Sequence, residues 1–456
     1  MKKLLAFLLA LTLMLSVTAC GQDAAANDDG QGAINLTLWT YPAGDWGDAA
    51  KVEDLLAQFN SVYPDIHVTV QCLDEATGDD KLSTAVDGGQ APDILLAQPD
   101  RLVKTWGAEG MLADLSDLWD DGDKVEVNDA CQSACFTSDG KCYAYPFAMN
   151  VQCMAINYDA FVTAGADQYI DLETRTWTTE QFTQAVKALQ DKYGETVAAV
   201  YCSGQNGDEG TRALITNLYG GEFTNDAHTA YTVNSEPIQQ ALTLLRDTKG
   251  IEFDDAINGD EEATLFYHES LKMSFCWSLA RQTTETVDEP AEEGAEPVVH
   301  EAGKTVNGQT IEFMSFPSET GESRLEGDIW CFGAFDNGDQ EKLEAAKLLI
   351  RFFADGQGTS AAVKAAGCFP VRSAADGASL SGIWSGSDVM QEYGKLTEQL
   401  GNYYQLTPGW ATARTEWWNL LQRIENGGDV VIETDTFVDN ANAAAKEYWH
   451  MKNGRP

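Results

Sequence analysis

An uncharged stretch about a third of the way along the chain places the strongest constraint on the fold. It runs from Phe147 to Ile156, between a polar turn at 139–140 and the polar triplet 157–159. This stretch is too short to span a bilayer, for which a helix needs about 20 residues. Unbroken apolarity over such a length is typical of a strand that is buried on both faces. We expect this strand to form the first crossing between two α/β lobes.

Length and charge limit the classes of function that the chain can have. Its 456 residues are enough for two domains with separate cores. It carries 72 acidic and 29 basic residues, which gives a formal net charge of −43. Nucleic acids and anionic membrane surfaces are bound through clustered Lys and Arg. We therefore expect no nucleic-acid partner and no binding of the folded part to an anionic membrane surface.

The N-terminus has the pattern of a bacterial lipoprotein signal. Lys2 and Lys3 precede an apolar segment, 4–15, that is short for a transmembrane helix. The sequence Val-Thr-Ala-Cys-Gly at 17–21 resembles a lipobox, whose cysteine, here Cys20, becomes lipidated. This predicts a signal peptide over 1–20, a flexible tether over 21–33 and a lipid anchor on the outer face of the cell membrane, or in the periplasm. An ordinary secretory signal with a chance cysteine is the alternative.

The remaining cysteines and the histidines do not form a recognisable framework. An odd and scattered set of cysteines favours packing as small apolar side chains over a disulfide framework. Cys131 and Cys135 could form a disulfide, or bind a metal with Cys142, but no histidine lies near them in the sequence. We expect no metal and no cofactor. The cysteines after Cys20 are Cys72, Cys131, Cys135, Cys142, Cys153, Cys202, Cys276, Cys331 and Cys368.

Alternating strand and helix patterns over residues 34–101 predict a mostly parallel sheet. Apolar alternation predicts strands at 34–39 and 66–72, an amphipathic helix spans 48–62, and a short helix precedes a third strand. Short links between them favour right-handed βαβ crossovers. Ligands bind at the carboxyl ends of such strands. The candidate residues at these ends are Tyr41, Asp45 and Trp46 in the first loop and Gln98, Asp100 and Arg101 in the second.

Four segments resemble the bacterial extracellular solute-binding proteins, the ligand-capturing lipoproteins of sugar ABC importers. The crossover 140–161 has their Gly-x-x-Tyr-x-x-Pro turn, apolar strand and Asn-x-Asp-x-Phe. Segment 91–115 contains Ala-Pro-Asp-Ile, Pro-Asp-Arg and Gly-Met-Leu-Ala-Asp-Leu. A Gly-containing strand with a Glu-Ala-Ala helix at 326–353, and Gly-Cys-Phe-Pro-Val-Arg at 367–372, complete the set. Together these segments are spread over nearly all of the mature chain.

The resemblance implies a two-lobe, periplasmic-binding-protein-like α/β fold with three hinge crossings. One lobe is expected over 34–147 and 318–369, the other over 148–317 and 370–450. The ligand would lie between the lobes. In the similar maltose-binding protein, an Asp-Arg pair that matches Asp100 and Arg101 contacts sugar hydroxyls, and a ligand-contacting acid stands where this chain has Asn150. Ala97 replaces a stacking tryptophan of that protein, which argues against a malto-oligosaccharide ligand.

Aromatic residues near the predicted cleft are candidate sugar platforms. Sugars offer apolar ring faces and hydroxyls, which suit aromatic rings and Asp, Asn, Gln or Arg side chains. The chain has 12 Trp and 15 Tyr, most of which we expect in the core. Trp277, Trp330 and Trp410 are the further candidates for stacking, although Trp330 could equally be a core residue. Arg414, close after Trp410, completes the set of candidate ligand-binding residues.

We therefore expect a monomeric, non-catalytic binding protein that captures a carbohydrate, specifically an oligosaccharide, and delivers it to ABC permease subunits. A secreted glycosidase is the alternative, since it needs two carboxylates about 5–5.5 Å or about 6.5–9.5 Å apart. The sequence contains no Gly-x-Ser-x-Gly, Walker or His-Glu-x-x-His motif. A surface adhesin would predict repeats or a stalk, and we find neither.

Overall fold

The computed structural model describes residues 33–453 except 76, 120–126, 138, 195, 205–206, 290–295, 373–379 and 402. The predicted signal peptide and Cys20, and all but the last residue of the predicted tether, lie outside the described residues. Among the residues that are described, no helix combines the length and apolarity needed to cross a membrane.

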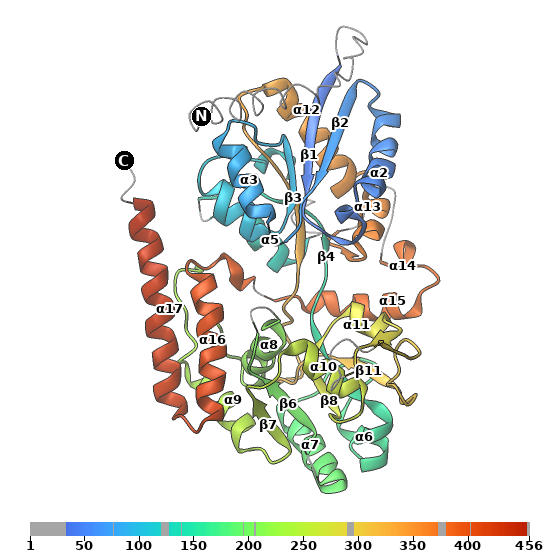
Figure 1. Cartoon of the computed structure of the whole chain (residues 1–456), viewed down its shortest axis with the longest axis vertical. Coiled ribbons are helices and arrows are strands. Elements are labelled where there is room, and N and C mark those ends of the chain that lie inside the picture. Colours follow the sequence, from blue (N-terminus) through green and yellow to red (C-terminus); the bar gives the residue numbers. More distant parts are fainter. Residues whose placement is uncertain are drawn as a thin grey trace, which may run out of the picture.

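The first lobe, at the top of Figure 1, contains a six-stranded sheet with the order β13-β4-β12-β3-β1-β2. β1 pairs in parallel with β2 and β3, which confirms the predicted parallel core. β12 joins β3 and β4 as an antiparallel strand. The strands are β1 (Ile34–Thr40), β2 (Ile66–Cys72), β3 (Ile94–Ala97), β4 (Tyr145–Met149), β12 (Ile329–Ala334) and β13 (Phe369–Pro370).

Helices flank this sheet and bury their apolar faces against it. α2 begins after Asp48, whose carboxylate accepts the Ala50 N–H at 2.9 Å, and it buries Val52, Leu56 and Phe59. This is the amphipathic helix that the sequence predicts. The helices of this lobe are η1 (Gly44–Gly47), α2 (Ala49–Val62), α3 (Gly78–Asp87), η2 (Asp100–Gly107), η3 (Ser116–Leu118), α5 (Asp129–Cys135), α12 (Gln340–Ala354) and α13 (Thr359–Ala366).

The second lobe contains smaller sheets. β5 is the central strand of an antiparallel sheet with the order β11-β5-β8, and β6 pairs in parallel with β7. A short antiparallel pair, β9-β10, follows β8. The strands are β5 (Cys153–Asn157), β6 (Ala198–Tyr201), β7 (Ile251–Asp254), β8 (Met273–Trp277), β9 (Thr286–Val287), β10 (Val298–Val299) and β11 (Ile311–Met314).

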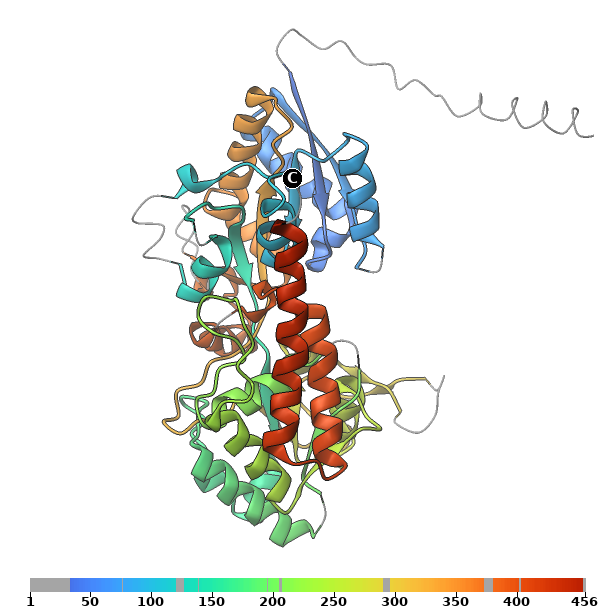
Figure 2. The same ribbon diagram turned by 90° about the vertical axis from the view of Figure 1, so that its left-hand side faces the viewer.

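Local capping and packing define the helices of the second lobe. A capping box opens α7, where the Thr178 hydroxyl accepts the Gln181 N–H and the Gln181 side chain accepts the Thr178 N–H. α16 and α17 pack side by side, and Figure 2 shows them along one flank of the molecule. The helices are α6 (Tyr158–Ala164), η4 (Asp167–Tyr169), α7 (Thr179–Tyr193), α8 (Glu209–Leu218), α9 (Glu236–Asp247), α10 (Gly259–Tyr267), α11 (Leu279–Thr283), α16 (Trp410–Glu425) and α17 (Val430–Asn453).

The chain crosses between the lobes three times. The prediction of one buried strand over 147–156 is wrong, because β4 and β5 belong to different sheets and residues 150–152 connect them. Both strands are buried, and no charged residue lies between them in the sequence. The second crossing joins β11 to β12, and the third follows β13. Four short helices follow the third crossing: α14 (Leu380–Ile383), α15 (Asp388–Gly394), η5 (Lys395–Gln399) and η6 (Tyr404–Leu406).

The cysteines of the described residues pack mainly in the cores. Cys131, Cys135 and Cys331 are fully buried, and the sulfurs of Cys135 and Cys331 lie 4.0 Å apart. Burial raises the pKa of the Cys135 thiol well above its ordinary value. Within the described part of the chain, no group of cysteines, histidines and carboxylates has an arrangement that could hold a metal ion.

Candidate functional site at the lobe junction

Two crossing segments lie antiparallel at the junction of the lobes. The Asn150 N–H donates to the Asp328 carbonyl at 3.0 Å, and the Asp328 N–H donates to the Asn150 carbonyl at 3.1 Å. The Gln152 N–H donates to the Glu326 carbonyl at 2.7 Å. A Cβ on Gly327 would lie only 1.9 Å from the Asn150 carbonyl oxygen. The close pairing therefore requires glycine at 327, and it fixes the two neighbouring acids at the junction.

Asp328 joins a polar cluster with two predicted residues of the first lobe. Gln98 and Asp100 follow the carboxyl end of β3, as expected. The Gln98 amide nitrogen donates to Asp328 Oδ1 at 2.9 Å. The Tyr403 hydroxyl lies 3.1 Å from Gln98 Oε1 and 3.3 Å from Asp100 Oδ1. Burial raises the pKa of Asp328. Through Asp328, the structure brings Gln98 and Asp100 close to Asn150.

The Arg101 side chain contacts residues of the first lobe that differ from the partners of its neighbour Asp100. Its Nε lies 2.9 Å from Asp79 Oδ1, and its Nη2 lies 2.8 Å from Glu75 Oε2. The guanidinium carbon lies 3.9 Å from the centroid of the Tyr41 ring. Tyr41 is fully buried and donates its hydroxyl hydrogen to Asp79. Arg101 and Tyr41 therefore fix the loop after β1 to α3, and the structure leaves Tyr41 no open ring face for a sugar.

The predicted Trp46 lies in the core of the first lobe rather than at the junction. It is fully buried, and its indole N–H donates to the Ala362 carbonyl at 3.1 Å. Its ring packs edge-on against three aromatic rings at centroid distances of 5.4 to 5.9 Å. Its neighbour Asp45 is exposed on η1. The loop after β1 thus turns its large side chain inward, towards α13. The three rings are those of Phe147, Phe332 and Phe353.

Trp277 and Trp330 are also core residues. Trp277 is fully buried between Phe266 and Tyr267, and its indole N–H donates to Gln282 at 2.9 Å. Trp330 is 7% exposed in β12, the strand between β3 and β4. Position at a strand end predicts proximity to the ligand but does not tell which face of the sheet a side chain occupies. These tryptophans occupy core faces.

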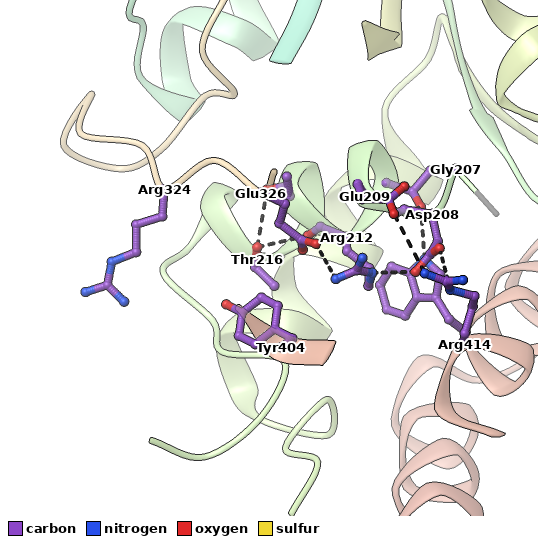
Figure 3. A network of polar contacts seen from close by, with 12 residues as sticks. Gly207, Asp208, Glu209, Arg212, Thr216, Arg324, Glu326, Tyr404 and Arg414 are labelled. Atoms are coloured by element: carbon purple, nitrogen blue, oxygen red, sulfur yellow. Dashed lines mark hydrogen bonds and ion pairs between the residues drawn. The ribbon is translucent and has the colours of Figure 1, made fainter. Parts of the chain in front are cut away.

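A second polar cluster lies on the other side of the junction (Figure 3). Arg212 of α8 is fully buried, its Nε lies 2.6 Å from Asp208 Oδ2, and its Nη1 pairs with Glu326 of the second crossing. Arg414 of α16 places its Nε 3.0 Å from Asp208 Oδ1 and its Nη2 3.8 Å from Glu209. The cluster therefore ties α8 and α16 of the second lobe to the crossing that carries Asp328.

Trp410 packs against both guanidinium groups of this cluster. The guanidinium carbon of Arg212 lies 4.8 Å from the Trp410 ring centroid, and that of Arg414 lies 5.5 Å away. Both distances are within the range of cation–π attraction. Trp410 is the first residue of α16 and is only partly buried. The structure thus brings together two predicted residues, Trp410 and Arg414, and leaves part of the indole accessible.

The second cluster has more carboxylates than cations. Asp208, Glu209 and Glu326 share the guanidinium groups of Arg212 and Arg414. Burial raises the pKa of Glu326 to about 8, and the neighbouring acids act in the same direction, whereas Arg212 opposes them. Burial also raises the pKa of Glu209. A proton on Glu326 balances the charge of the cluster.

Replacing Glu326 by glutamine is expected to weaken the pH dependence of stability. With a folded pKa of about 8 against an ordinary 4.5, the folded protein keeps a proton that the unfolded chain releases. Stability therefore falls as the pH rises from about 4.5 to about 8, and the variant removes this contribution. Denaturant unfolding across this pH range measures it, with the exposed Glu341→Gln as control. If the free energy of unfolding changes with pH equally in the variant and in the wild type, the raised pKa of Glu326 is contradicted.

Lys104 joins the lobes away from the crossings. It lies on η2, and its Nζ donates to the Gln405 carbonyl at 3.1 Å and to the Thr407 carbonyl. The Tyr448 hydroxyl of α17 donates to the Lys104 carbonyl at 3.4 Å. Burial lowers the pKa of Lys104 to about 8. The helix that begins with Asp100 thus contacts the loop that leads into α16.

We expect the two lobes to be separated in a larger fraction of Lys104→Met molecules than of wild-type molecules. The variant loses two hydrogen bonds from an amine to carbonyls, and such a bond to a charged group contributes about 1.5–3 kcal/mol. The radius of gyration in X-ray scattering without ligand should increase, while the exposed Lys51→Met should leave it unchanged. An unchanged radius in Lys104→Met would show that this contact does not hold the lobes together.

Several residues of the junction were not predicted from the sequence. Arg212 carried a signal, because it directly precedes the apolar helix segment Ala213-Leu214-Ile215. Glu326 and Asp328 belong to a segment that we used only for its strand. Tyr403 gave no local signal, since its contacts are to residues about 300 positions earlier in the chain.

The chain belongs to the bacterial extracellular solute-binding protein family, whose model matches residues 54–398. This places it among proteins that act outside the cytoplasm. A search of curated protein sequences found no match.

Solved structures of sugar-binding proteins share the two-lobe fold. The cyclic alpha-maltosyl-1,6-maltose binding protein of Arthrobacter globiformis has a TM-score of 0.70 at 19% identity, over 91% of this chain and 100% of that chain. The sugar-binding protein MalE of Xanthomonas citri has a TM-score of 0.70 at 15% identity, over 92% and 100%. An ABC substrate-binding protein of Listeria monocytogenes in complex with cycloalternan has a TM-score of 0.60 at 18% identity, over 90% and 98%. At these identities the likeness confirms the predicted fold.

Proposed function

We propose that this protein is the substrate-binding component of an ABC importer and captures a carbohydrate, most simply an oligosaccharide, between its lobes. One observation carries the proposal: side chains from both lobes and from two crossings converge at the junction. The first lobe contributes Gln98 and Asp100, and the second contributes Trp410 and Arg414. The paired crossings between them carry Asn150, Glu326 and Asp328.

The chemistry of these groups suits a saccharide. Asp100 and Asp328 offer carboxylate oxygens as acceptors for sugar hydroxyls. Trp410 offers an aromatic surface for the apolar face of a pyranose ring. Closure of two lobes about a hinge would bring the groups onto one ligand. Three of the similar structures are described as a cyclic alpha-maltosyl-1,6-maltose binding protein, a sugar-binding protein and a complex with cycloalternan, which supports a carbohydrate.

The remaining parts of the proposal follow from the family and the N-terminus. We propose that Cys20 is lipidated, that the protein stands as a monomer on the extracellular or periplasmic side of the membrane, and that it delivers its ligand to permease subunits. The lobe bounds at 34–147 with 318–369, and 148–317 with 370–450, remain part of this proposal. The proposed boundary between the lobes after residue 147 falls inside β4. No observation favours the glycosidase alternative, and the family consists of binding proteins.

A thermal-shift screen of the purified protein against mono- and oligosaccharides tests the function. A saccharide at 100 times its dissociation constant should stabilise the protein by about 2.7 kcal/mol. The stabilising saccharide should remain intact after prolonged incubation. If no saccharide shifts the unfolding temperature, carbohydrate capture is wrong. Turnover that is lost in Asp100→Asn or Asp328→Asn would instead establish the glycosidase.

Asp100→Ala should weaken binding of the stabilising saccharide by about 1–3 kcal/mol, because a ligand hydroxyl loses a charged partner. Its unfolding temperature without ligand should hardly change, since among the described residues the Asp100 side chain has a single hydrogen bond, of 3.3 Å, to the Tyr403 hydroxyl. Titration calorimetry measures the affinity, and Asp87→Ala, an exposed change at the end of α3, is the matched control. Equal affinities in Asp100→Ala and the control would remove Asp100 from the site.

A further inference from the structure

We infer that the junction selects its saccharide by charge, accepting a neutral or amine-bearing sugar and rejecting one that carries a carboxylate, sulfate or phosphate. The inference rests on the proposed function and adds the class of substrate. It is carried by the arrangement of charged groups around Asp100 and Asp328, and by the partners that the cations of the junction already have.

Four cations near the junction are engaged by groups of the protein itself. Arg101 pairs with Glu75 and Asp79 while its planar face covers the Tyr41 ring. Lys104 donates to two backbone carbonyls. The other two cations, Arg212 and Arg414, lie among the carboxylates of Asp208, Glu209 and Glu326. An acidic ligand would have to displace one of these carboxylates to gain a partner.

Asp100 and Asp328 have neutral partners. Gln98 donates to Asp328, and the Tyr403 hydroxyl contacts Asp100. Over the described ranges, no Lys or Arg forms an ion pair with either carboxylate. Tyr403 is only 3% exposed, so its hydroxyl holds the Asp100 carboxylate in a fixed position. The junction thus presents two carboxylates that a hydroxyl or an ammonium group can approach and that another anion cannot approach without repulsion.

The charge of the whole protein acts in the same direction. A net charge of −43 produces a negative potential that lowers the local concentration of anions. This long-range part is screened over about 8–10 Å at physiological salt, whereas the contact with Asp100 and Asp328 is screened less. Together the two effects should reduce the affinity for an acidic saccharide at least about tenfold relative to its neutral counterpart.

The test uses matched oligosaccharides in several linkages, each made in a neutral form, a form with one amino group and a form with one uronate. Titration calorimetry of the full protein at pH 7 and low salt gives the three affinities for each linkage. In a linkage that binds, the neutral and amino forms should bind at least tenfold more tightly than the uronate, and added salt should narrow the difference. Tightest binding of the uronate overturns the charge selection and leaves the proposed function intact. Absence of binding in every form and linkage overturns the proposed function itself.

Variants identify the groups responsible. Asp100→Asn with Asp328→Asn keeps the size of both side chains and one acceptor oxygen in each, but removes their charges. The ratio of neutral to uronate affinity should fall by about tenfold in this double variant. It should not change in Asp87→Asn, whose side chain is exposed at the end of α3. An unchanged ratio in the double variant would overturn the assignment of selectivity to these carboxylates.

Discussion

Arg212→Met is expected to lower the free energy of unfolding by about 3–5 kcal/mol, the cost of removing one partner from a buried ion-pair network. Arg212 is fully buried and pairs with Asp208 and Glu326. Methionine has a similar length but no charge, so Glu326, which holds its proton near neutral pH, loses a hydrogen-bond donor, and Asp208 keeps Arg414 as its ion-pair partner. The charge of the buried Asp208 is then compensated less.

Denaturant unfolding at pH 7 measures the effect, and Arg246→Met provides a control. Arg246 pairs with its neighbour Asp247 on the surface, with 35% of its side chain exposed, and such pairs contribute about 0–1 kcal/mol. A loss in Arg212→Met no larger than that of the control would contradict a tightly coupled network. Arg212→Met should also affect ligand binding. The centroid of the Trp410 ring lies 4.8 Å from the Arg212 guanidinium carbon, so the ring should lose its fixed position in the variant.

A second substitution distinguishes lost charge compensation from lost packing. Above about pH 8, where Glu326 is ionised, combining Arg212→Met with Glu326→Gln removes one of the carboxylates that the arginine compensates. We expect the double variant to recover part of the lost stability, since replacing both partners of a buried pair costs less than removing one. A double variant whose losses simply add would indicate that packing of the long Arg212 side chain dominates.

Local patterns in the sequence were sufficient to predict much of the fold. β1, α2 and β2 follow from apolar alternation and helical spacing, and α7 follows from its capping box. The break at 150–152 could not be predicted, because the two strands beside it are both buried in sheets and no charge marks the change. Sheet membership is decided by pairing with β11 and β12, which lie more than 150 residues later.

The candidate site was predicted in part. Gln98 and Asp100 follow from the rule for strand ends, and Trp410 with Arg414 from the start of a helix. Trp46 and Trp277 were misplaced because composition and position do not reveal on which face of a strand or loop a ring packs. The residues that connect the two halves, Arg212, Glu326 and Tyr403, act through contacts across more than 100 positions. Such contacts leave no local periodicity or motif.

Gly327→Ala should destabilise the protein by about 3 kcal/mol, because the added methyl group meets backbone that cannot rotate away. The new Cβ would lie 1.9 Å from the Asn150 carbonyl oxygen and 2.8 Å from the Val151 Cα. The two crossings must then separate, which breaks the hydrogen bonds between Asn150 and Asp328. The separation also moves Asp328 away from Gln98, so saccharide affinity should fall together with stability.

Thermal and denaturant unfolding, together with titration of the stabilising saccharide, measure both effects of Gly327→Ala. Gly88→Ala is the matched control: it ends α3 at a φ of −80°, and its Cβ would come no closer than 3.2 Å to the Thr84 carbonyl oxygen. That variant should change stability by less than about 1 kcal/mol. If Gly327→Ala keeps wild-type stability and affinity, the crossings tolerate a wider spacing. The paired segments would then not be what positions Glu326 and Asp328 at the junction.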